Sequence, residues 1–321
     1  MIKTTVVIPN YNGEKYIEQC LDSLLACENK INIIVVDNGS SDKSVEIIKS
    51  KYSSVDLVEL NENTGFCHAV NLGISLSKTQ YVFLFNNDAT VNKDTIKKLE
   101  ADLDSNDKLF SAQAMMLSMS DPTLVDSAGD EFCALGWAFA TGKDKNAQNY
   151  KGKRYVFSAC GGAALYRRDA FEKIGDFDEN HFAYLEDVDI GYRARINGYK
   201  NMVDKDAIVL HAGSKTSGSR HNDFKVKLSA RNSIYLIYKN MPALMLILNL
   251  PFIIIGIIIK SLFFARKNLF ASYAKGIAEG LKLCFSTKGQ ENKVRFKKEN
   301  ISTYIAIEII LIVNVFRRFL G

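Results

Sequence analysis

Several short apolar segments of this sequence end in carboxylate or amide side chains. Asn86-Asn87-Asp88 directly follows the apolar residues 81–85. A carboxylate at the end of a buried strand is well placed to hold Mg²⁺ or Mn²⁺ against a diphosphate, because hard cations prefer oxygen ligands. Asp88 is therefore a candidate metal ligand. A turn or helix cap before residues 90–103 is the alternative interpretation.

Asp37 has a similar position, directly after the apolar residues 31–36. Its carboxylate could accept the imide N–H of a uracil or thymine ring. Asp37-Asn38-Gly39-Ser40 is also a competent turn sequence, and a plain turn is the structural alternative.

His211 ends the apolar residues 207–210. It could offer a metal ion a neutral nitrogen ligand opposite an aspartate, although a buried, hydrogen-bonded imidazole is the commoner case. No role is assigned to His68, His181 or His221.

Glu186, Asp187 and Asp189 place three carboxylates within four residues. Their mutual repulsion should raise the pKa of at least one of them, which suits a general base. The alternative is favourable negative charge at the start of a helix, and we prefer that interpretation for Asp189.

Strands and helices must alternate to position these side chains. We expect strands at residues 5–8, 31–36, 55–60 and 81–85, and helices at residues 14–26, 42–50 and 65–77. This alternation predicts an α/β sheet that binds ligands outside the carboxyl ends of its strands. Asn10, Asp37 and Asp88 all sit at such ends. Further along, we expect strands at 156–166 and 207–211 and helices at 168–174 and 182–197.

The composition is that of an ordinary globular protein, with 321 residues, 47% apolar and 24% charged. This length predicts one catalytic domain plus an appendage. The six cysteines are scattered without a CxxC pair, which favours a reduced, cytosol-facing chain. The first residues show no signal-peptide pattern.

Positive charge is concentrated near the C-terminus. Residues 260–321 contain 12 Lys or Arg and 4 Asp or Glu, whereas the rest of the chain contains 29 and 32. A slightly acidic body with a basic, apolar tail argues against nucleic acid as a partner. It indicates an anionic membrane surface or a phosphate-bearing lipid.

Residues 240–259 carry no charge over 20 positions, about the length that crosses a bilayer. Pro251 should kink a spanning helix. Residues 268–285 repeat apolar side chains at helical spacing, the pattern of a helix lying in the membrane interface. We therefore expect peripheral or monotopic attachment at the cytoplasmic face of the cell membrane. The alternative is a pair of helices that pack on the catalytic domain or form a homodimer.

Taken together and in this order, the motifs resemble glycosyltransferase family 2, the inverting GT-A enzymes. The resemblance covers about residues 1–240, and the chain looks most like the rhamnosyltransferase-type members that build bacterial surface polysaccharides. The matching segments are residues 7–12, 35–42, 61–66 with Asn71, 84–88, 161–163 before Arg168, 177–179, Glu186-Asp187 with Asp189, and His211.

The resemblance implies an α/β fold of the GT-A type, a Rossmann-like, mostly parallel sheet flanked by helices, over residues 1–240. A helical, membrane-associating extension would follow at 241–321. The implied nucleoside-binding residues are Pro9, Asn10, Asn12 and Asp37, with Asn63, Asn71 and Asn87 nearby. The implied metal ligands for Mg²⁺ or Mn²⁺ are Asp88 and His211, the acceptor site contains Gly161, Gly162 and Glu186, and the catalytic base is Asp187.

One residue departs from the family pattern. Many GT-A enzymes have an Asp-x-Asp triplet, whereas here its first position is Asn86, so only Asp88 offers a full charge. Asn86 is then expected to contact metal or ribose weakly or through water.

The resemblance further implies a nucleotide diphosphate sugar donor, dTDP-rhamnose first and UDP-sugars next. The implied acceptor is a saccharide or a polyprenyl-diphosphate-linked saccharide. A sugar-nucleotide pyrophosphorylase would need a Gly-rich, basic loop after the first strand, but residues 9–14 contain one glycine and little positive charge. A non-catalytic sugar-nucleotide-binding subunit with the same fold is the other alternative.

Overall fold

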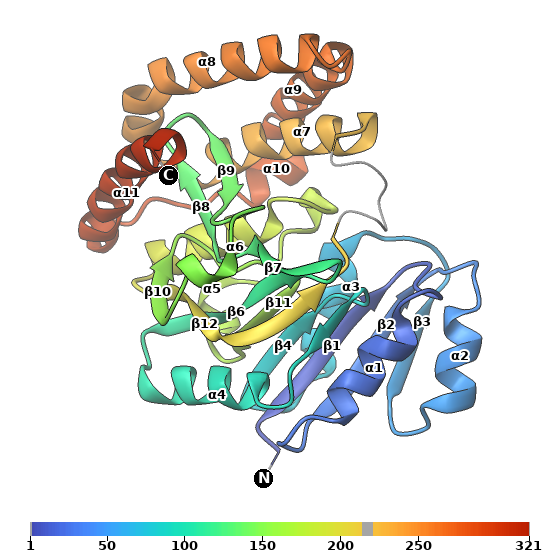
Figure 1. The fold of residues 1–321 in the computed structure, drawn as a ribbon. Helices are drawn as coiled ribbons and strands as arrows, with labels where there is room; N and C mark the ends of the chain where they lie inside the picture. The colour runs from blue at the N-terminus through green and yellow to red at the C-terminus, as the bar shows by residue number, and fades with distance from the viewer. Residues whose placement is uncertain (1, 214–220, 321) are drawn as a thin grey trace.

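A computed structural model describes residues 2–213 and 221–320, and a ten-stranded mixed sheet forms its centre (Figure 1). Neighbouring strands follow the order β10-β12-β6-β11-β4-β1-β2-β3, with β5 paired to β12 and β7 paired to β6. The strands of this sheet are β1 (Thr4–Asn10), β2 (Asn32–Asn38), β3 (Asp56–Leu60), β4 (Tyr81–Phe85), β5 (Ala89–Val91), β6 (Leu109–Ser118), β7 (Asp121–Ser127), β10 (Lys153–Val156), β11 (Ala163–Arg167) and β12 (Lys200–His211).

Helices cover both faces of the sheet. One face packs against α1 (Ile17–Leu25), α2 (Ser44–Lys51) and α4 (Thr95–Ser105). The opposite face packs against α3 (Phe66–Leu76), α5 (Ala170–Ile174) and α6 (Glu186–Ile196). Successive residues of β1 serve the two cores in turn, Val6 and Ile8 on one side and Val7 on the other, as the alternation of side chains along a strand requires. The predicted doubly covered α/β sheet is therefore confirmed.

The parallel strands β4, β1, β2 and β3 bring their carboxyl ends to one edge of the sheet. Asn10 at the end of β1 lies in register with Asp37 at the end of β2. Asp88 follows β4 at the same edge. The sequence-based expectation that these polar residues share an edge is thus met.

Several of the expected elements differ in the structure, and the strand expected at 207–211 begins at Lys200. The strand expected at residues 156–166 is two strands, because β10 ends at Val156 and β11 begins at Ala163, with Gly161-Gly162 in the loop between them. Residues 89–91 form the short strand β5, and helix α4 begins only at Thr95.

The helix expected from residue 182 begins at Glu186 instead. Phe182, Tyr184 and Leu185 have positive φ angles between 62° and 69°, a region that non-glycine residues rarely adopt. This loop therefore cannot be helical, and α6 starts directly at the acidic pair.

A separate hairpin and the C-terminal helices form a layer above the sheet (Figure 1). The hairpin consists of β8 (Asp130–Cys133) and β9 (Trp137–Ala140). The helices are α7 (Asp223–Asn240), α8 (Ala243–Ala265), α9 (Phe270–Cys284), α10 (Thr287–Glu291) and α11 (Ile301–Leu320), and short 3-10 turns lie at Ala147–Asn149, Glu179–His181 and Lys298–Asn300. Pro251 lies inside α8, which is assigned as one uninterrupted helix.

Helix α7 joins this layer to the catalytic body, by which we mean the central sheet and the helices that cover it, the part expected from the sequence to be the catalytic domain. Its Lys239 is buried, and the Nζ atom lies 2.8 Å from a carboxylate oxygen of Asp178 and 2.8 Å from one of Asp189. At α9, Gly276 and Gly280 allow close approach to the backbone of α7. The division of the chain at residue 240 stays a prediction, with α7 in contact with both parts.

Candidate active site

Buried amides and carboxylates form a connected cradle at the ends of β1, β2 and β4. The Asn10 amide donates to Asp37 Oδ1 at 2.7 Å, and the Asn87 amide donates to Asn10 Oδ1 at 2.8 Å. Asp37 also accepts bonds from the Ser40 backbone N–H and hydroxyl. Asn10, Asp37 and Asn87 are buried, and their own hydrogen bonds hold the cradle in place.

The other predicted nucleoside residues have different surroundings. Asn12 is exposed at the rim and its Oδ1 accepts the Ser41 N–H at 2.9 Å, while Pro9 is half-buried at the end of β1. Asn63 caps the turn before α3 through the Gly65 N–H. These residues surround the same sheet edge.

Asn71 is engaged elsewhere, at the middle of α3. Its amide donates to the Phe177 carbonyl at 2.8 Å and accepts the Phe177 N–H at 3.0 Å. The Asn71 amide also donates to Glu179. The contacts that the structure shows for Asn71 hold the segment before α6, and its predicted place beside the nucleoside stays a prediction.

Asp88 and His211 face each other at the end of β4. His211 Nε2 lies 3.1 Å from Asp88 Oδ1, and its Nδ1 lies 2.9 Å from Asp126 Oδ2. Asp126 in turn bonds Lys143. Burial alone would lower the pKa of His211, but the hydrogen bonds and charges of Asp126 and Asp88 outweigh it and raise that pKa to about 9.

These two groups fit a divalent cation. Both ring nitrogens of His211 face carboxylate oxygens, but a neutral imidazole carries only one N–H, so one of the two contacts needs a second proton or a metal ion. The Asp126 carboxylate orients the ring from the other nitrogen, as a carboxylate behind a metal-binding histidine does. Asn86 Nδ2 also lies 3.2 Å from His211 Nε2, so Asn86 borders the place for the ion.

A cavity of about 500 Å³ opens beside this site, between the loop after β10, the hairpin and the start of α6. Five residues that the sequence analysis singled out line it, namely Asn86, Gly161, Gly162, Glu186 and Asp187. The Gly162 carbonyl accepts the Asn86 N–H at 3.0 Å, and a Cβ at Gly162 would lie 2.8 Å from the Asn86 side chain. Because Gly162 has no side chain, the cavity wall can lie directly against the loop that carries Asn86 and Asp88.

The carboxylates of this cavity hold protons more strongly than ordinary carboxylates do. Burial, followed by the negative charge of Asp187, raises the pKa of Glu186 to about 8. One Glu186 oxygen is buried without a hydrogen-bond partner among the described residues. A buried unpaired oxygen is costly, so this group is suited to receive a hydroxyl from a ligand.

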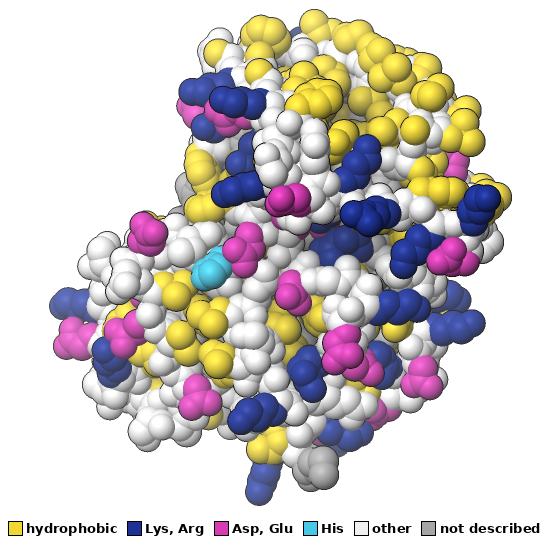
Figure 2. Space-filling view, turned by 180° about the vertical axis from the view of Figure 1, so that it is seen from behind, with side chains coloured by type: hydrophobic (Ala, Val, Ile, Leu, Met, Phe, Trp, Pro, Cys, Tyr) yellow, Lys and Arg dark blue, Asp and Glu magenta, His cyan; other side chains and the backbone are white. Residues whose placement is uncertain are grey.

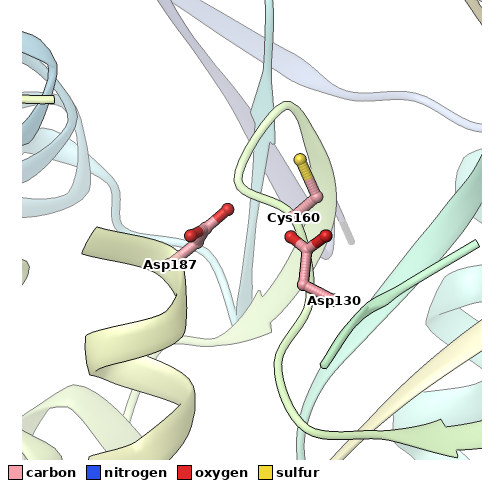
Figure 3. Close-up of side chains that lie close together, drawn as sticks. All are labelled: Asp130, Cys160 and Asp187. Atoms are coloured by element: carbon pink, nitrogen blue, oxygen red, sulfur yellow. The ribbon is translucent and has the colours of Figure 1, made fainter. Parts of the chain in front are cut away.

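Asp187 has a close carboxylate partner that the sequence prediction did not include. Asp130, at the start of β8, and Asp187, at the start of α6, project towards each other beside Cys160 (Figure 3). Burial and then the charge of Asp187 raise the pKa of Asp130 well above its usual range. Burial also raises the pKa of Asp187, while the N–H groups of Val188 and Gly161 and a hydrogen bond from Asp130 act in the opposite direction.

Asp130, Cys160 and Asp187 offer three ligand atoms within 4.8 Å of one another. Burial keeps the Cys160 thiol protonated by raising its pKa far above the usual range. A protonated thiol is a poor ligand for Mg²⁺ or Mn²⁺, which prefer oxygen. Asp88 with His211 is therefore the better site for such an ion.

Asp189 points away from the cavity. It is fully buried, and its oxygens contact Arg193 at 3.0 Å, Lys239 at 2.8 Å and Asn240 at 2.7 Å. Burial alone would raise the pKa of Asp189, but the charges of Lys239 and Arg193 outweigh it and hold that pKa well below its usual range. This geometry fits a structural Asp189, through ion pairs to α7 in addition to the expected effect of the helix N-terminus.

Polar side chains of α7 hold the strained loop before the acidic pair. The Asn232 amide lies within hydrogen-bond distance of three carbonyls, those of His181, Ala183 and Tyr184, at 2.7–2.9 Å. Strained backbone persists only where its surroundings fix it. Asn232 supplies such a constraint directly before Glu186.

Comparison with known proteins agrees with this arrangement. A model of the family described as glycosyl transferase family 2 matches residues 5–175. The chain is 27% identical over 242 residues to an N-acetylglucosaminyl-diphospho-decaprenol L-rhamnosyltransferase of Mycobacterium tuberculosis, covering 66% of this chain and 77% of that protein.

Two solved structures show the same fold at lower identity. The Pyrobaculum calidifontis mannosyltransferase PcManGT in complex with GDP-Man and Mn²⁺ has a TM-score of 0.56 at 15% identity, covering 96% of this chain and 87% of that one. S. aureus TarS 1–349 in complex with UDP-GlcNAc has a TM-score of 0.53 at 20% identity, covering 95% and 79%. Together with the sheet described above, they confirm the predicted GT-A fold.

We expect Asp88→Ala to abolish Mn²⁺-dependent nucleotide binding and His211→Ala to weaken it. Asp126→Asn should weaken Mn²⁺ binding about 10–100-fold, because it orients the histidine from behind. Titration calorimetry with Mn²⁺, with and without nucleotide, measures these effects. Asp121→Asn, an exposed carboxylate on the same strand as Asp126, is the control. Wild-type binding by both the Asp88 and His211 variants would show that the assignment is wrong.

We expect Asp130→Ala to raise the pKa of Asp187, because the substitution removes a hydrogen bond to the ionised carboxylate. The midpoint of the Asp187 carboxyl titration by NMR should move to higher pH. Asp130→Asn keeps an N–H donor and should move the midpoint less. Identical midpoints in all three proteins would show that Asp130 does not tune Asp187.

Proposed function

The chain belongs to glycosyltransferase family 2, and we propose that it transfers a sugar, with inversion, from a nucleotide diphosphate donor to a lipid-linked saccharide. The observation that carries this proposal is the position of Asp187. Asp187 lines a cavity that Asn86 and Gly162 also line. Asn86 contacts His211, and the Gly162 carbonyl accepts the Asn86 N–H, so the cavity borders the Asp88–His211 pair. An acceptor hydroxyl in the cavity would thus lie beside a donor bound at the sheet edge.

In this proposal the side chains of the chain divide the work. Asn10 and Asp37 hold the base and ribose of the donor in the cradle. Asp187 takes the proton from the acceptor hydroxyl as that oxygen bonds to the anomeric carbon and the nucleoside diphosphate leaves from the opposite face. Glu186, protonated at neutral pH, donates to or accepts from a second acceptor hydroxyl and so orients the sugar.

Asp88 and His211 would hold the divalent cation, Mg²⁺ or Mn²⁺. The bound ion would neutralise the charge that develops on the departing diphosphate. The Asp88 carboxylate supports this assignment, because carboxylate oxygens are the ligands that Mg²⁺ and Mn²⁺ prefer.

The donor and acceptor that we favour are rhamnose from dTDP-rhamnose and a polyprenyl-diphosphate-linked saccharide. The support is the relative of M. tuberculosis, whose name describes rhamnosyl transfer to N-acetylglucosaminyl-diphospho-decaprenol. UDP-sugars come next, since the similar TarS structure contains UDP-GlcNAc. Thermal-shift screening against nucleotide sugars with Mn²⁺ tests the choice, because a bound donor stabilises the folded state.

We further propose that the C-terminal helices lie in the cytoplasmic face of the membrane. In length and composition, residues 243–265 and 298–319 could cross a bilayer. Hydrophobic side chains gather on this end of the molecule, with Lys and Arg side chains beside them (Figure 2). The middle of α8 is tied to the hairpin, where the Trp137 indole donates to the Gly256 carbonyl at 3.2 Å. A helix held along its length on one side favours lying in the interface over spanning it.

We expect Asp187→Asn to lower kcat about 10²–10⁴-fold with little change in donor affinity, because it removes the proton acceptor and keeps the size. Radiolabelled transfer measures kcat, and calorimetry measures donor binding. Asp189→Asn should chiefly lower the Tm, since it weakens the contact with Lys239. Equal loss of kcat from both variants, or none from Asp187→Asn, contradicts the assignment. Saturable donor binding without turnover in the wild type would support a binding subunit instead.

We expect Ile247→Asp with Ile258→Asp, on the exposed face of α8, to reduce binding to phosphatidylglycerol liposomes at least about tenfold. Burying one such side chain contributes about 1.5–3 kcal/mol, which a carboxylate forfeits. Leu25→Asp with Leu76→Asp, exposed on the catalytic body, is the matched control. A wild-type protein that stays soluble without detergent and ignores such liposomes would favour packed or dimer-forming helices.

A further inference from the structure

A second, larger cavity lies among the C-terminal helices. It measures about 1120 Å³ and is bordered by α7, α8, α9, α11 and the start of β9. Its lining is basic and aromatic, and the residues that matter here are Lys225, Lys260, Lys267, Arg318, Trp137, Phe263 and Phe319. No Asp or Glu is among the described residues that line it.

Three of the cations lie over aromatic rings. The Lys260 amine is 5.5 Å from the Trp137 ring, the Lys267 amine is 5.2 Å from the Phe263 ring, and the Arg318 guanidinium is 5.5 Å from the Phe139 ring. Burial, reinforced by the Arg318 charge, lowers the pKa of Lys260 to about 8. A lysine whose charge is destabilised in this way gains from a bound anion.

A neighbouring basic cavity of about 710 Å³ differs, because carboxylates lie beside its cations. Three of its cations already have carboxylate partners, since Lys143 pairs with Asp126, and Arg154 and Arg317 pair with the buried Glu131. Lys145 and Arg318 also line it, and Arg318 is shared with the cavity beside Lys260. The cavity beside Lys260 has no carboxylate among its described lining residues, so it is the better candidate for an anionic ligand.

The basic cavity borders both the apolar surface and the acceptor cavity. Ile259 and Phe263, which line it, are more than 40% exposed on α8. Ser229 of α7 lines both this cavity and the cavity that contains Asp187. The sequence of environments is thus apolar helix face, basic cavity, acidic catalytic cavity.

We propose that this cavity binds the diphosphate head of the lipid-linked acceptor, with its isoprenoid chain along the apolar face of α8 and its sugar directed past Ser229 towards Asp187. The inference rests on the proposed function for the choice of a lipid-linked acceptor. Lys260, Lys267 and Arg318 supply the charge-assisted hydrogen bonds that a diphosphate accepts. Lys260, Lys267 and Arg318 each also lie over an aromatic ring, which adds a cation–π contact.

The test compares binding of the full chain to three probes. These are phosphatidylcholine vesicles that contain a polyprenyl diphosphate, phosphatidylglycerol vesicles of matched surface charge, and soluble inorganic pyrophosphate as competitor. The wild type should bind the diphosphate vesicles more tightly than the matched anionic vesicles, and pyrophosphate should remove that difference. Equal binding to both kinds of vesicle would overturn the proposal in favour of general attraction to anionic membranes.

The variant Lys260→Gln/Lys267→Gln/Arg318→Gln should lose at least about tenfold in affinity for the diphosphate vesicles. A control that removes the same charge from exposed positions outside the cavity is Lys275→Gln/Lys282→Gln/Lys297→Gln. The control should retain the preference for diphosphate. Equal losses from both triple variants would contradict the proposal.

Two further variants keep the test decisive. Lys267→Gln alone, at an exposed position, should weaken diphosphate binding by itself if the triple variant does not fold. Asp187→Asn should bind the diphosphate vesicles like the wild type and fail to transfer sugar. Retained lipid binding without any transfer by the wild type would contradict the proposed function alone, whereas transfer that survives loss of the three cations would contradict the cavity alone.

Discussion

The buried contact of Lys239 with the carboxylates of Asp178 and Asp189 is the interaction on which the position of helix α6 depends. All three groups are buried, and Arg193 adds a second positive charge, so the cluster of two cations and two anions is neutral. Removing four charges from water is costly, and only close pairing offsets that cost. The pairing therefore fixes α6 against α7, and with it the direction in which Glu186 and Asp187 point.

The same helix α7 controls the loop before that pair. Asn232 holds the carbonyls of residues 181, 183 and 184, and the positive φ angles of Phe182, Tyr184 and Leu185 persist because of this support. The sequence prediction extended the helix back to residue 182, since nothing in the local sequence reveals that a residue some fifty positions later fixes the loop. Helix starts that depend on distant side chains are outside the reach of local patterns.

The sheet edge could be predicted because its pattern is local. Each apolar run ends in its own polar residue, and parallel pairing then brings Asn10, Asp37 and Asp88 to one edge. Asp126 and Asp130 escaped prediction, because β7 and β8 have little apolar periodicity and the value of both residues lies in what they face. Their signal is spatial: Asp126 faces His211, and Asp130 faces Asp187.

Two groups of carboxylates lie near the proposed donor site, and their surroundings give them opposite properties. Asp126 faces His211 and Lys143, and these hydrogen bonds keep its pKa low although burial opposes them. Among the described residues, Glu186, Asp187 and Asp130 have one another and backbone N–H groups as partners and no cation, so burial prevails and their pKa values rise. Carboxyl groups whose pKa values are shifted in opposite directions can divide the work, because those with a low pKa can hold a cation and those with a raised pKa can accept a proton.

The hairpin carrying Asp130 is itself held by the C-terminal helices, through a hydrogen bond from Asn314 to Glu131 and one from Trp137 to the Gly256 carbonyl. The surface that we propose faces the lipid and the Asp130 carboxyl that we propose tunes the base are thus parts of one packed unit.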